Sequence, residues 1–363
     1  MPATGKRHRS GELRLSQTAQ NLIERTISFN FSSEPVTPPK VSACIACAGS
    51  LETSAFGLFD TRFGIPGDCE ARRCHKCGLE QLSPIPTAAG LKDLYERYYN
   101  FGGEHDTLYT RLRERFFSSP LHRLWAFLDG DISFYTRRGT GRLLDIGCNE
   151  GRGLTIYSRN GYKVEGLELN EMAAAVARRK GFAVHTTSLE RFTPDTLFDV
   201  AVLSNVLEHS LDPAQMLRDV RRILKPGGQV WISCPNSRSW LRSFFEKYWI
   251  NWHVPFHIVH FSPSTLGTTL TRGGFTNAQI CQITPSLWVA SSVIARMFAR
   301  REQPTRQLRN PFLVFALMLI ARLVCFPLLI LGNRSGRGDC LIAIATAEQS
   351  VTIDHPAKAS LGL

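Results

Sequence analysis

Apolar runs and helix-length segments alternate in a regular order over the middle of the chain. A short run, Leu143–Ile146, leads into a glycine-rich turn, a helix-length segment and a second run, Val164–Leu167. An alanine-rich helical segment at 170–180 and two further runs, 182–185 and 198–203, follow. Mostly apolar runs of this length are typical of strands buried on both faces of a parallel sheet. The pattern therefore predicts an α/β fold, with helices on both faces of the sheet.

The turn after the first of these runs has the composition of a nucleotide-binding loop. Asp145 precedes it, and Gly147, Gly151 and Gly153 occur along it. Glycines let the backbone pass close to a ligand, and the start of the next helix offers unpaired N–H groups. The second strand ends on Glu168, 23 residues after Asp145, a separation typical of an acid that binds ribose hydroxyls. The sequence predicts a nucleotide site here, with a turn that binds nothing as the alternative.

The dinucleotide fingerprint does not fit this turn. It requires glycine at the first, third and sixth positions, whereas counting from Gly147 the chain has Asn149 third and Arg152 sixth. The pattern acid-x-Gly-x-Gly-x-Gly fits better, with Asn149 as the exception. Asparagine is among the few residues that tolerate a positive φ, so this exception is compatible with the pattern.

Two later motifs point to one family. The first follows the run at 198–203 and reads Asn205, Leu207, Glu208 and His209. The second, Lys-Pro-Gly-Gly at 225–228, is expected to end a helix before a strand at 230–233. With the turn, these motifs make the chain similar to the class I S-adenosylmethionine-dependent methyltransferases, in particular the bacterial type-11 and type-23 group. The resemblance covers about 141–283 and a last strand at 339–346, and it implies a Rossmann-like sheet of seven strands.

The resemblance also implies S-adenosylmethionine as the methyl donor. It places the cofactor against the turn, the ribose acid and the loops that follow the third and fourth strands, at Asp145, Gly147, Asn149, Gly151, Glu168, Ser188, Leu189 and Asn205. The family often has Pro-x-His followed by Phe-Ser-Pro, matched here at 255–257 and 261–263. A hydroxyl acceptor needs a base, for which we expect His209 or His257. For His253, His257 and His260 the alternatives are structural histidines or a metal site.

Four cysteines form the clearest chemical signal outside the fold. Two Cys-x-x-Cys pairs, separated by 26 residues, comprise Cys44, Cys47, Cys74 and Cys77. Two such pairs can place four thiolates around one zinc ion, as the two knuckles of a zinc ribbon do. Gly49 and Gly78 suit the tight turns around the metal. Because no ligand position is left for water, we expect structural zinc, with redox dithiols as the alternative.

The sequence divides into six segments by composition. These are a basic arm without a predicted fold (1–40), the zinc ribbon (41–83), a helical linker or lid with Tyr98 or Tyr99 (84–138), the methyltransferase domain (139–284 and 339–348), an apolar and basic helical insertion (285–338), and a tail (349–363). No apolar leader occurs in the first 40 residues, and ten cysteines suit a reducing compartment, so we expect a cytoplasmic protein.

The insertion has the composition of a membrane-associated segment. Between Pro311 and Leu331 its only charged residue is Arg322, and several arginines precede it. A single span is excluded because the last strand must return to the sheet that the chain has left. We expect either a helical hairpin held against the inner face of a membrane, or an apolar pair packed on the domain or on a second subunit.

The excess of basic residues indicates an anionic partner. The chain has 43 Lys and Arg against 31 Asp and Glu, a formal net charge of +12. We expect methylation of a small-molecule, glycan or lipid-linked acceptor, on oxygen or carbon. The alternatives are an RNA methyltransferase that uses the ribbon for recognition, and a non-catalytic scaffold that binds zinc and partners.

Overall fold

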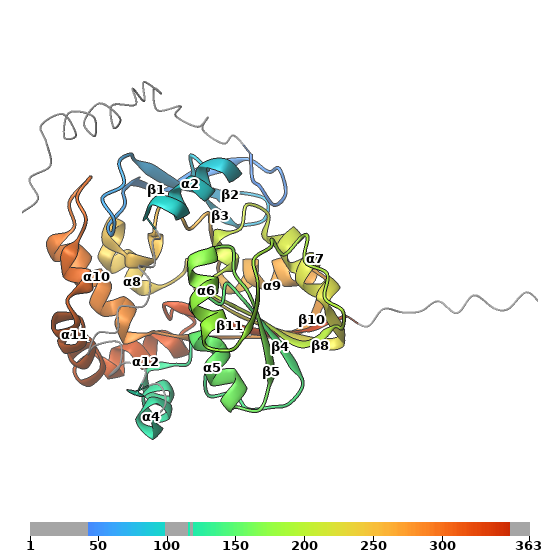
Figure 1. The fold of residues 1–363 in the computed structure, drawn as a ribbon. Helices are drawn as coiled ribbons and strands as arrows, with labels where there is room; N and C mark the ends of the chain where they lie inside the picture. The colour runs from blue at the N-terminus through green and yellow to red at the C-terminus, as the bar shows by residue number, and fades with distance from the viewer. Residues whose placement is uncertain (1–42, 99–114, 117–118, 349–363) are drawn as a thin grey trace, which may run out of the picture. The chain divides into compact units, whose positions relative to one another are not determined.

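A computed structural model describes residues 43–98, 115–116 and 119–348 (Figure 1). The predicted basic arm, Tyr99 and the tail lie outside these residues. Seven strands form the central sheet, and their bounds are β4 (Arg142–Ile146), β5 (Lys163–Leu167), β6 (Ala183–His185), β7 (Phe198–Ser204), β8 (Leu224–Pro235), β10 (Phe275–Ile283) and β11 (Cys340–Ala347). The order is β10-β11-β8-β7-β4-β5-β6, and β11 runs antiparallel to both neighbours. The predicted seven-stranded α/β sheet is confirmed.

Side chains alternate between two apolar layers, one on each face of this sheet. Leu144 and Ile146 of β4 pack in a cluster with residues of α7 (Pro213–Ile223) and α9 (Pro263–Arg272). Their neighbour Leu143 packs on the opposite face with Tyr157 of α5 (Arg152–Arg159). Burial on both faces explains why the parallel strands are nearly continuous apolar runs rather than alternating ones. Helix α6 (Glu171–Arg179) joins β5 to β6.

The cysteine-rich module forms a second, antiparallel sheet. It contains β1 (Leu51–Leu58), β2 (Cys69–Cys74) and β3 (Glu80–Ser83), and its fourth strand is β9 (Val259–His260). Glu80 pairs with His260 and Gln81 with Val259, so a strand that precedes α9 completes the sheet. The buried Glu80 also forms an ion pair with Arg242 at 2.7 Å. The ribbon is therefore joined through backbone and side chains to the segment that carries the predicted histidines.

The remaining helices lie before β4, between β7 and β8, and between β8 and β11. They are α2 (Ala88–Tyr98), α4 (Pro120–Asp129), η1 (Leu207–His209), α8 (Trp240–Phe245), η2 (Glu246–Tyr248), η3 (Ile250–Trp252), α10 (Ser286–Phe298), η4 (Arg306–Arg309), α11 (Pro311–Leu323) and α12 (Phe326–Arg334). Within the described residues, no single helix is long and apolar enough to cross a membrane. Helices α11 and α12 meet that length and composition only as a pair, which is bent by 69°.

Candidate active site and cysteine cluster

The turn between β4 and α5 adopts the backbone conformation that its sequence suggests. Gly147, Asn149 and Gly151 have φ values of 73°, 52° and 76°. Asn149 therefore takes the left-handed conformation that favours glycine, as the sequence allowed. A Cβ atom on Gly151 would lie 2.8 Å from the Cβ of Ala177 in α6, so α5 begins in close contact with that helix. The turn needs a glycine there for packing as well as for φ.

Two acids stand on either side of this turn. Glu168 is half-buried, and its carboxylate accepts hydrogen bonds from the backbone N–H groups of Asn149 (2.9 Å) and Asn170 (2.8 Å). It thereby connects the turn to the start of α6. Asp145 is buried beside Gly153, where an added Cβ would lie 2.4 Å from its carboxylate. Burial, reinforced by the negative charge of Glu168, raises the pKa of Asp145 to about 7.

Asn205 lies at the end of β7 and has an unsatisfied polar atom. Its φ is 55°, and its side-chain Oδ1 is buried without a hydrogen-bond partner among the described residues. The adjacent Val206 contacts the turn, since a Cβ on Gly147 would lie 3.0 Å from its Cγ2. A buried acceptor without a partner costs free energy unless a ligand satisfies it. The glycine turn, the anchored acid and this free amide oxygen together fit a polar nucleoside cofactor such as S-adenosylmethionine.

The two predicted adenine contacts lie beyond β6. Ser188 donates a hydrogen bond to Glu190 at 3.2 Å, and Leu189 packs in the apolar cluster beneath α7 and α9. Their contact with a cofactor stays a prediction.

Glu208 is the most unusual polar residue at this edge of the sheet. It lies in η1, immediately after the loop that follows β7, and its exposed fraction is 0%. Neither carboxylate oxygen has a hydrogen-bond partner within the described chain. The nearest base is Nε2 of His257, 3.9 Å from Oε1. Burial therefore raises the pKa of Glu208 to about 8, so this acid can exchange a proton near neutral pH.

The structure brings together the two histidines predicted as bases. The rings of His209 and His257 are 4.7 Å apart and meet edge to face. Nδ1 of His257 lies 2.8 Å from the carbonyl of Asn251, and Nδ1 of His209 lies 3.0 Å from the carbonyl of Phe256. A carbonyl can only accept, so each Nδ1 carries the proton. Each histidine therefore has its lone pair on Nε2.

Burial keeps both of these rings uncharged. It lowers the pKa of His209 to about 4 and that of His257 well below its usual value, the latter with a further contribution from the nearby His209. Ligand atoms of Glu208, His209 and His257 all lie within 4.8 Å of one another, so the three could also hold a metal ion. The sequence indicated His253, His257 and His260 as a candidate metal site. The group in the structure shares only His257 with that set.

The other two histidines of this segment pack against neighbouring rings. His260 is buried in β9, stacks edge to face on Trp252 at 4.9 Å, and has its pKa lowered by burial to about 3. His253 lies with Nδ1 3.3 Å from Nε2 of His257. Its backbone φ is 39°, at the end of η3. These contacts order the wall beside Glu208.

Sequence reasoning missed Tyr95. Its hydroxyl lies 2.8 Å from Nδ1 of His209, so α2 reaches the histidine pair from a distant part of the sequence. Tyr98, one of the two tyrosines considered for the lid, packs against Phe63 of the ribbon at 6.4 Å, and its role in a lid stays a prediction. Tyr95 falls on the apolar face of a helical repeat, and that signal does not distinguish a core aromatic from one that faces a site.

The four predicted zinc ligands converge. The Sγ atoms of Cys44 and Cys77 are 3.6 Å apart, those of Cys47 and Cys74 are 3.4 Å apart, and all four lie within 4.8 Å of one another. Four thiolates at about 2.3 Å from a tetrahedral zinc ion are separated by about 3.8 Å, so the cluster has a suitable size. A Cβ on Gly49 would lie 2.9 Å from the Sγ of Cys74, which explains the glycine in this knuckle.

Comparisons with known proteins agree with this architecture. Residues 109–280 match the family described as methyltransferase domain. The ubiquinone biosynthesis O-methyltransferase of Sodalis glossinidius is 32% identical over 123 residues, which cover 31% of this chain and 49% of that protein. Its counterpart in Pseudomonas aeruginosa (strain LESB58) is 36% identical over 103 residues, 26% of this chain and 44% of that protein. The chain thus spans about half the length of the curated relatives it matches.

Among solved structures, a SAM-dependent methyltransferase from Archaeoglobus fulgidus is similar, with a TM-score of 0.40 and 20% identity over 66% of this chain and 100% of that one. Likeness at this level does not extend to the details of a site. The strand order, the glycine turn and the family match identify the central part of the molecule. Residues 109–280 therefore carry a methyltransferase domain, and the strand order and the glycine turn are similar to those of S-adenosylmethionine-dependent enzymes.

Proposed function

We propose that this chain transfers a methyl group from S-adenosylmethionine to a hydroxyl group of a small or lipid-linked acceptor, with Glu208 as the base. The observation that carries the proposal is the fully buried carboxylate of Glu208, which has no hydrogen-bond partner among the described residues. Leaving an acid in this state is costly unless a ligand compensates it. Glu208 lies close to the cofactor turn in the chain, because Val206, two residues before it, contacts that turn.

The chain itself supplies positioning and a proton acceptor. Bound S-adenosylmethionine would supply an electrophilic methyl group with its leaving group already attached, so little other chemistry is asked of the protein. In its ionised form Glu208 takes the proton of the acceptor hydroxyl as the oxygen–carbon bond forms. His209 and His257 carry their protons on Nδ1, bonded to backbone carbonyls, and so hold uncharged rings beside the acid. A buried, desolvated carboxylate is a stronger base than one in water.

For the cysteine cluster we propose structural zinc. Cys44, Cys47, Cys74 and Cys77 offer four thiolates at suitable separations, and all four coordination positions are then filled by the protein. Zinc there would fix the ribbon, whose third strand is hydrogen-bonded to β9 beside the histidines. The metal would hold structure and take no part in the transfer.

Methyl-label transfer to a fractionated cell extract tests the function. The wild-type chain is expected to label the small-molecule or lipid fraction. Glu208→Gln is expected to lose labelling while calorimetry shows unchanged binding of S-adenosylhomocysteine, since the cofactor turn is intact. His257→Ala and His209→Ala separate the two predicted bases in the same assay. Label in the RNA fraction would contradict the proposed acceptor and favour an RNA methyltransferase. Failure of the wild type to bind S-adenosylhomocysteine would favour a scaffold.

A further inference from the structure

The exposed surface of α4, α11 and α12 is strongly apolar. These helices lie near one another (Figure 1), and α4 is tied to α11 through an ion pair. Eight large apolar side chains on these helices and at their junction are between 58% and 86% exposed: Leu121, Phe127, Phe312, Phe315, Leu323, Val324, Leu328 and Leu331. We call these eight residues the apolar face. Single exposed apolar residues are ordinary on a protein surface, whereas a concentration on neighbouring helices marks an interaction site.

The only charge in this apolar stretch is turned inward. Arg322 is 5% exposed, and its Nε donates to Asp129 at the end of α4 (3.0 Å). Its Nη2 also donates to Asp129 and to the carbonyl of Thr284 (2.9 Å). On a helix that faces water, the charged residue would point outward and the apolar ones inward. Here the arrangement is reversed, as expected for a helix whose outer side faces hydrocarbon.

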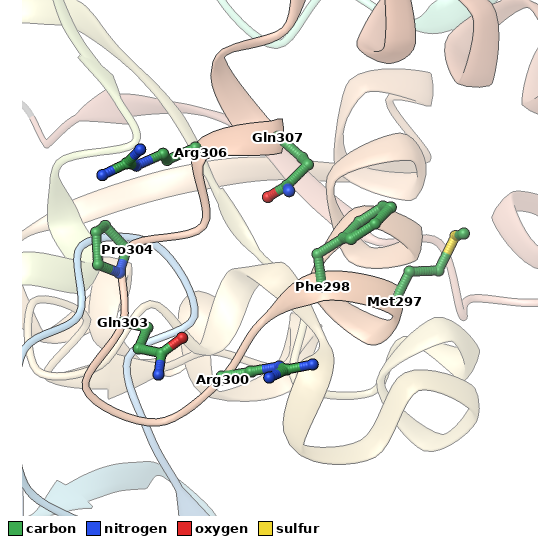
Figure 2. Close-up of a pocket in the computed structure, with 7 residues that line it drawn as sticks. All are labelled: Met297, Phe298, Arg300, Gln303, Pro304, Arg306 and Gln307. Atoms are coloured by element: carbon green, nitrogen blue, oxygen red, sulfur yellow. The ribbon is translucent and has the colours of Figure 1, made fainter.

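A basic hollow lies next to the apolar face. It has a volume of about 480 Å³ and follows one turn of chain from the end of α10 to η4, as Figure 2 shows, lined by Met297, Phe298, Arg300, Gln303, Pro304, Arg306 and Gln307. Arg300 and Arg306 are exposed, as is the nearby Arg309, and within the described residues none of the three forms an ion pair. The hollow therefore offers guanidinium and amide donors to an anion.

The sequence connects this hollow directly to the apolar face. Helix η4 ends at Arg309, and the side chain of Asn310 then caps α11 by accepting hydrogen bonds from the backbone N–H groups of Phe312 and Leu313, both at 3.1 Å. Guanidinium groups at one end of an apolar helix match the order of charges and hydrocarbon at a bilayer surface. A second copy of this chain fits less well, because a symmetric contact would bring like-charged arginines together.

We propose that the apolar face and the adjacent hollow dock in the plane of an anionic phospholipid bilayer, with α11 and α12 in the acyl region and a lipid phosphate in the Arg300–Arg306 hollow. The inference goes beyond methyl transfer and holds whether or not the acceptor is a lipid. A span is not required. Helix α11 has 13 residues, about 20 Å at 1.5 Å per residue, against a hydrocarbon core of about 30 Å, and the bend to α12 returns the chain toward β11.

Flotation of the full chain with vesicles tests the apolar part of the surface. The vesicles contain phosphatidylcholine, with or without phosphatidylglycerol. Phe312→Gln/Leu323→Gln/Val324→Gln is expected to weaken binding at least about a hundredfold, since three inserted side chains are lost. The matched control, Phe56→Gln/Leu169→Gln/Phe244→Gln, removes side chains that are 82%, 73% and 68% exposed on other elements, and it is expected to bind as wild type. Circular dichroism checks that both variants are folded.

A double substitution of the two arginines tests the hollow. Arg300→Gln/Arg306→Gln is expected to weaken binding to phosphatidylglycerol vesicles by roughly tenfold or more, at about 1 kcal/mol for each arginine, and to reduce its salt dependence. Lys92→Gln/Arg191→Gln removes the same charge from exposed sites elsewhere and is expected to have no effect. Inorganic phosphate at millimolar concentration is expected not to compete.

Three results would overturn the proposal. The first is equal flotation of the apolar variant and its control. The second is sedimentation of the wild type as a dimer that the apolar substitutions convert to a monomer, since a second copy would then cover this face. The third is competition by free phosphate at millimolar concentration, which would make the hollow a site for a soluble anion. Binding of S-adenosylhomocysteine is measured in parallel, so that failure of docking is distinguished from failure of the enzyme proposal.

Discussion

Glu208 and Arg322 are both buried charged residues, but their surroundings are opposite. Arg322 is paired, with Asp129 and the carbonyl of Thr284 as acceptors. Glu208 has no partner for either carboxylate oxygen within the described residues. A buried charge with partners holds elements together, whereas one without them requires a ligand or a proton. The difference separates a structural clamp from a candidate catalytic group, although burial alone would treat the two residues alike.

The largest effect is expected at the cysteine cluster, where zinc would be the partner of four thiolates. With zinc bound, the four thiolates would have a partner, as Arg322 does. Without zinc they would lack one, as Glu208 does. Cys74→Ser is expected to abolish stoichiometric zinc, measured by elemental analysis, and to remove hydrogen-exchange protection from β1–β3, because binding of structural zinc contributes about 10 kcal/mol or more in small domains. Cys281→Ser, at an exposed thiol outside the cluster, is the control. Full zinc in Cys74→Ser would contradict the assignment.

The clamp itself is the next test. Arg322→Met removes the guanidinium and leaves Asp129 buried without its cation, so we expect the free energy of unfolding to fall by about 3–5 kcal/mol in urea denaturation. Asp129→Asn/Arg322→Met removes the stranded charge and retains an acceptor for the backbone N–H of Ser286. This double variant is expected to recover part of the loss. Equal stability of the single and double variants would show that Asp129 is compensated in another way.

Glu208 is expected to show the reverse behaviour. Glu208→Gln removes a strained acid of nearly the same shape, so stability is expected to stay within about 1 kcal/mol or to increase, while turnover falls by about a hundredfold or more. Glu80→Gln serves as comparison, because Glu80 is equally buried but paired with Arg242, and there stability is expected to fall. If Glu208→Gln is destabilised but keeps normal turnover, Glu208 has a structural role like that of Arg322.

A further prediction concerns pH. The pKa of Glu208 is about 8 in the folded chain, above the 4.5 of an ordinary glutamate, so the folded state retains this proton between pH 4.5 and 8 while the unfolded state releases it. The contribution of this group to stability is therefore complete below pH 4.5 and is lost as the pH rises toward 8. Turnover is expected to rise over the upper part of this window. Unfolding measured at several pH values should show a flatter profile for Glu208→Gln.

Much of the methyltransferase domain could be predicted because its strands are buried on both faces. The observed β4, β5 and β7 agree with the predicted runs to within one residue at each end. The positive φ of Asn149 was also compatible with the sequence, since few residues other than glycine adopt it. One boundary was wrong. The Lys-Pro-Gly-Gly segment was expected to precede a strand at 230–233, but β8 already begins at Leu224.

The site itself could be predicted only in part. Motifs indicated His209 and His257 as candidate bases and placed Glu208 just after the strand at 198–203, but the absence of hydrogen-bond partners for Glu208 depends on the packing of many elements. The contact between Tyr95 and His209 joins residues 114 positions apart, and no local pattern specifies it. The inward direction of Arg322 likewise depends on Asp129, which lies almost 200 residues earlier. Pairings of this kind arise from tertiary structure and leave no periodic signal.

The two-residue strand β9 connects the ribbon to the segment that carries His257. His257 precedes it by only two residues, and β9 is the last strand of the sheet that begins among the cysteines. If the cluster holds zinc as proposed, loss of the metal is expected to loosen the wall around Glu208 as well as the two knuckles. Activity in a cell short of zinc would then follow the metal supply, even though the ion never meets the methyl group.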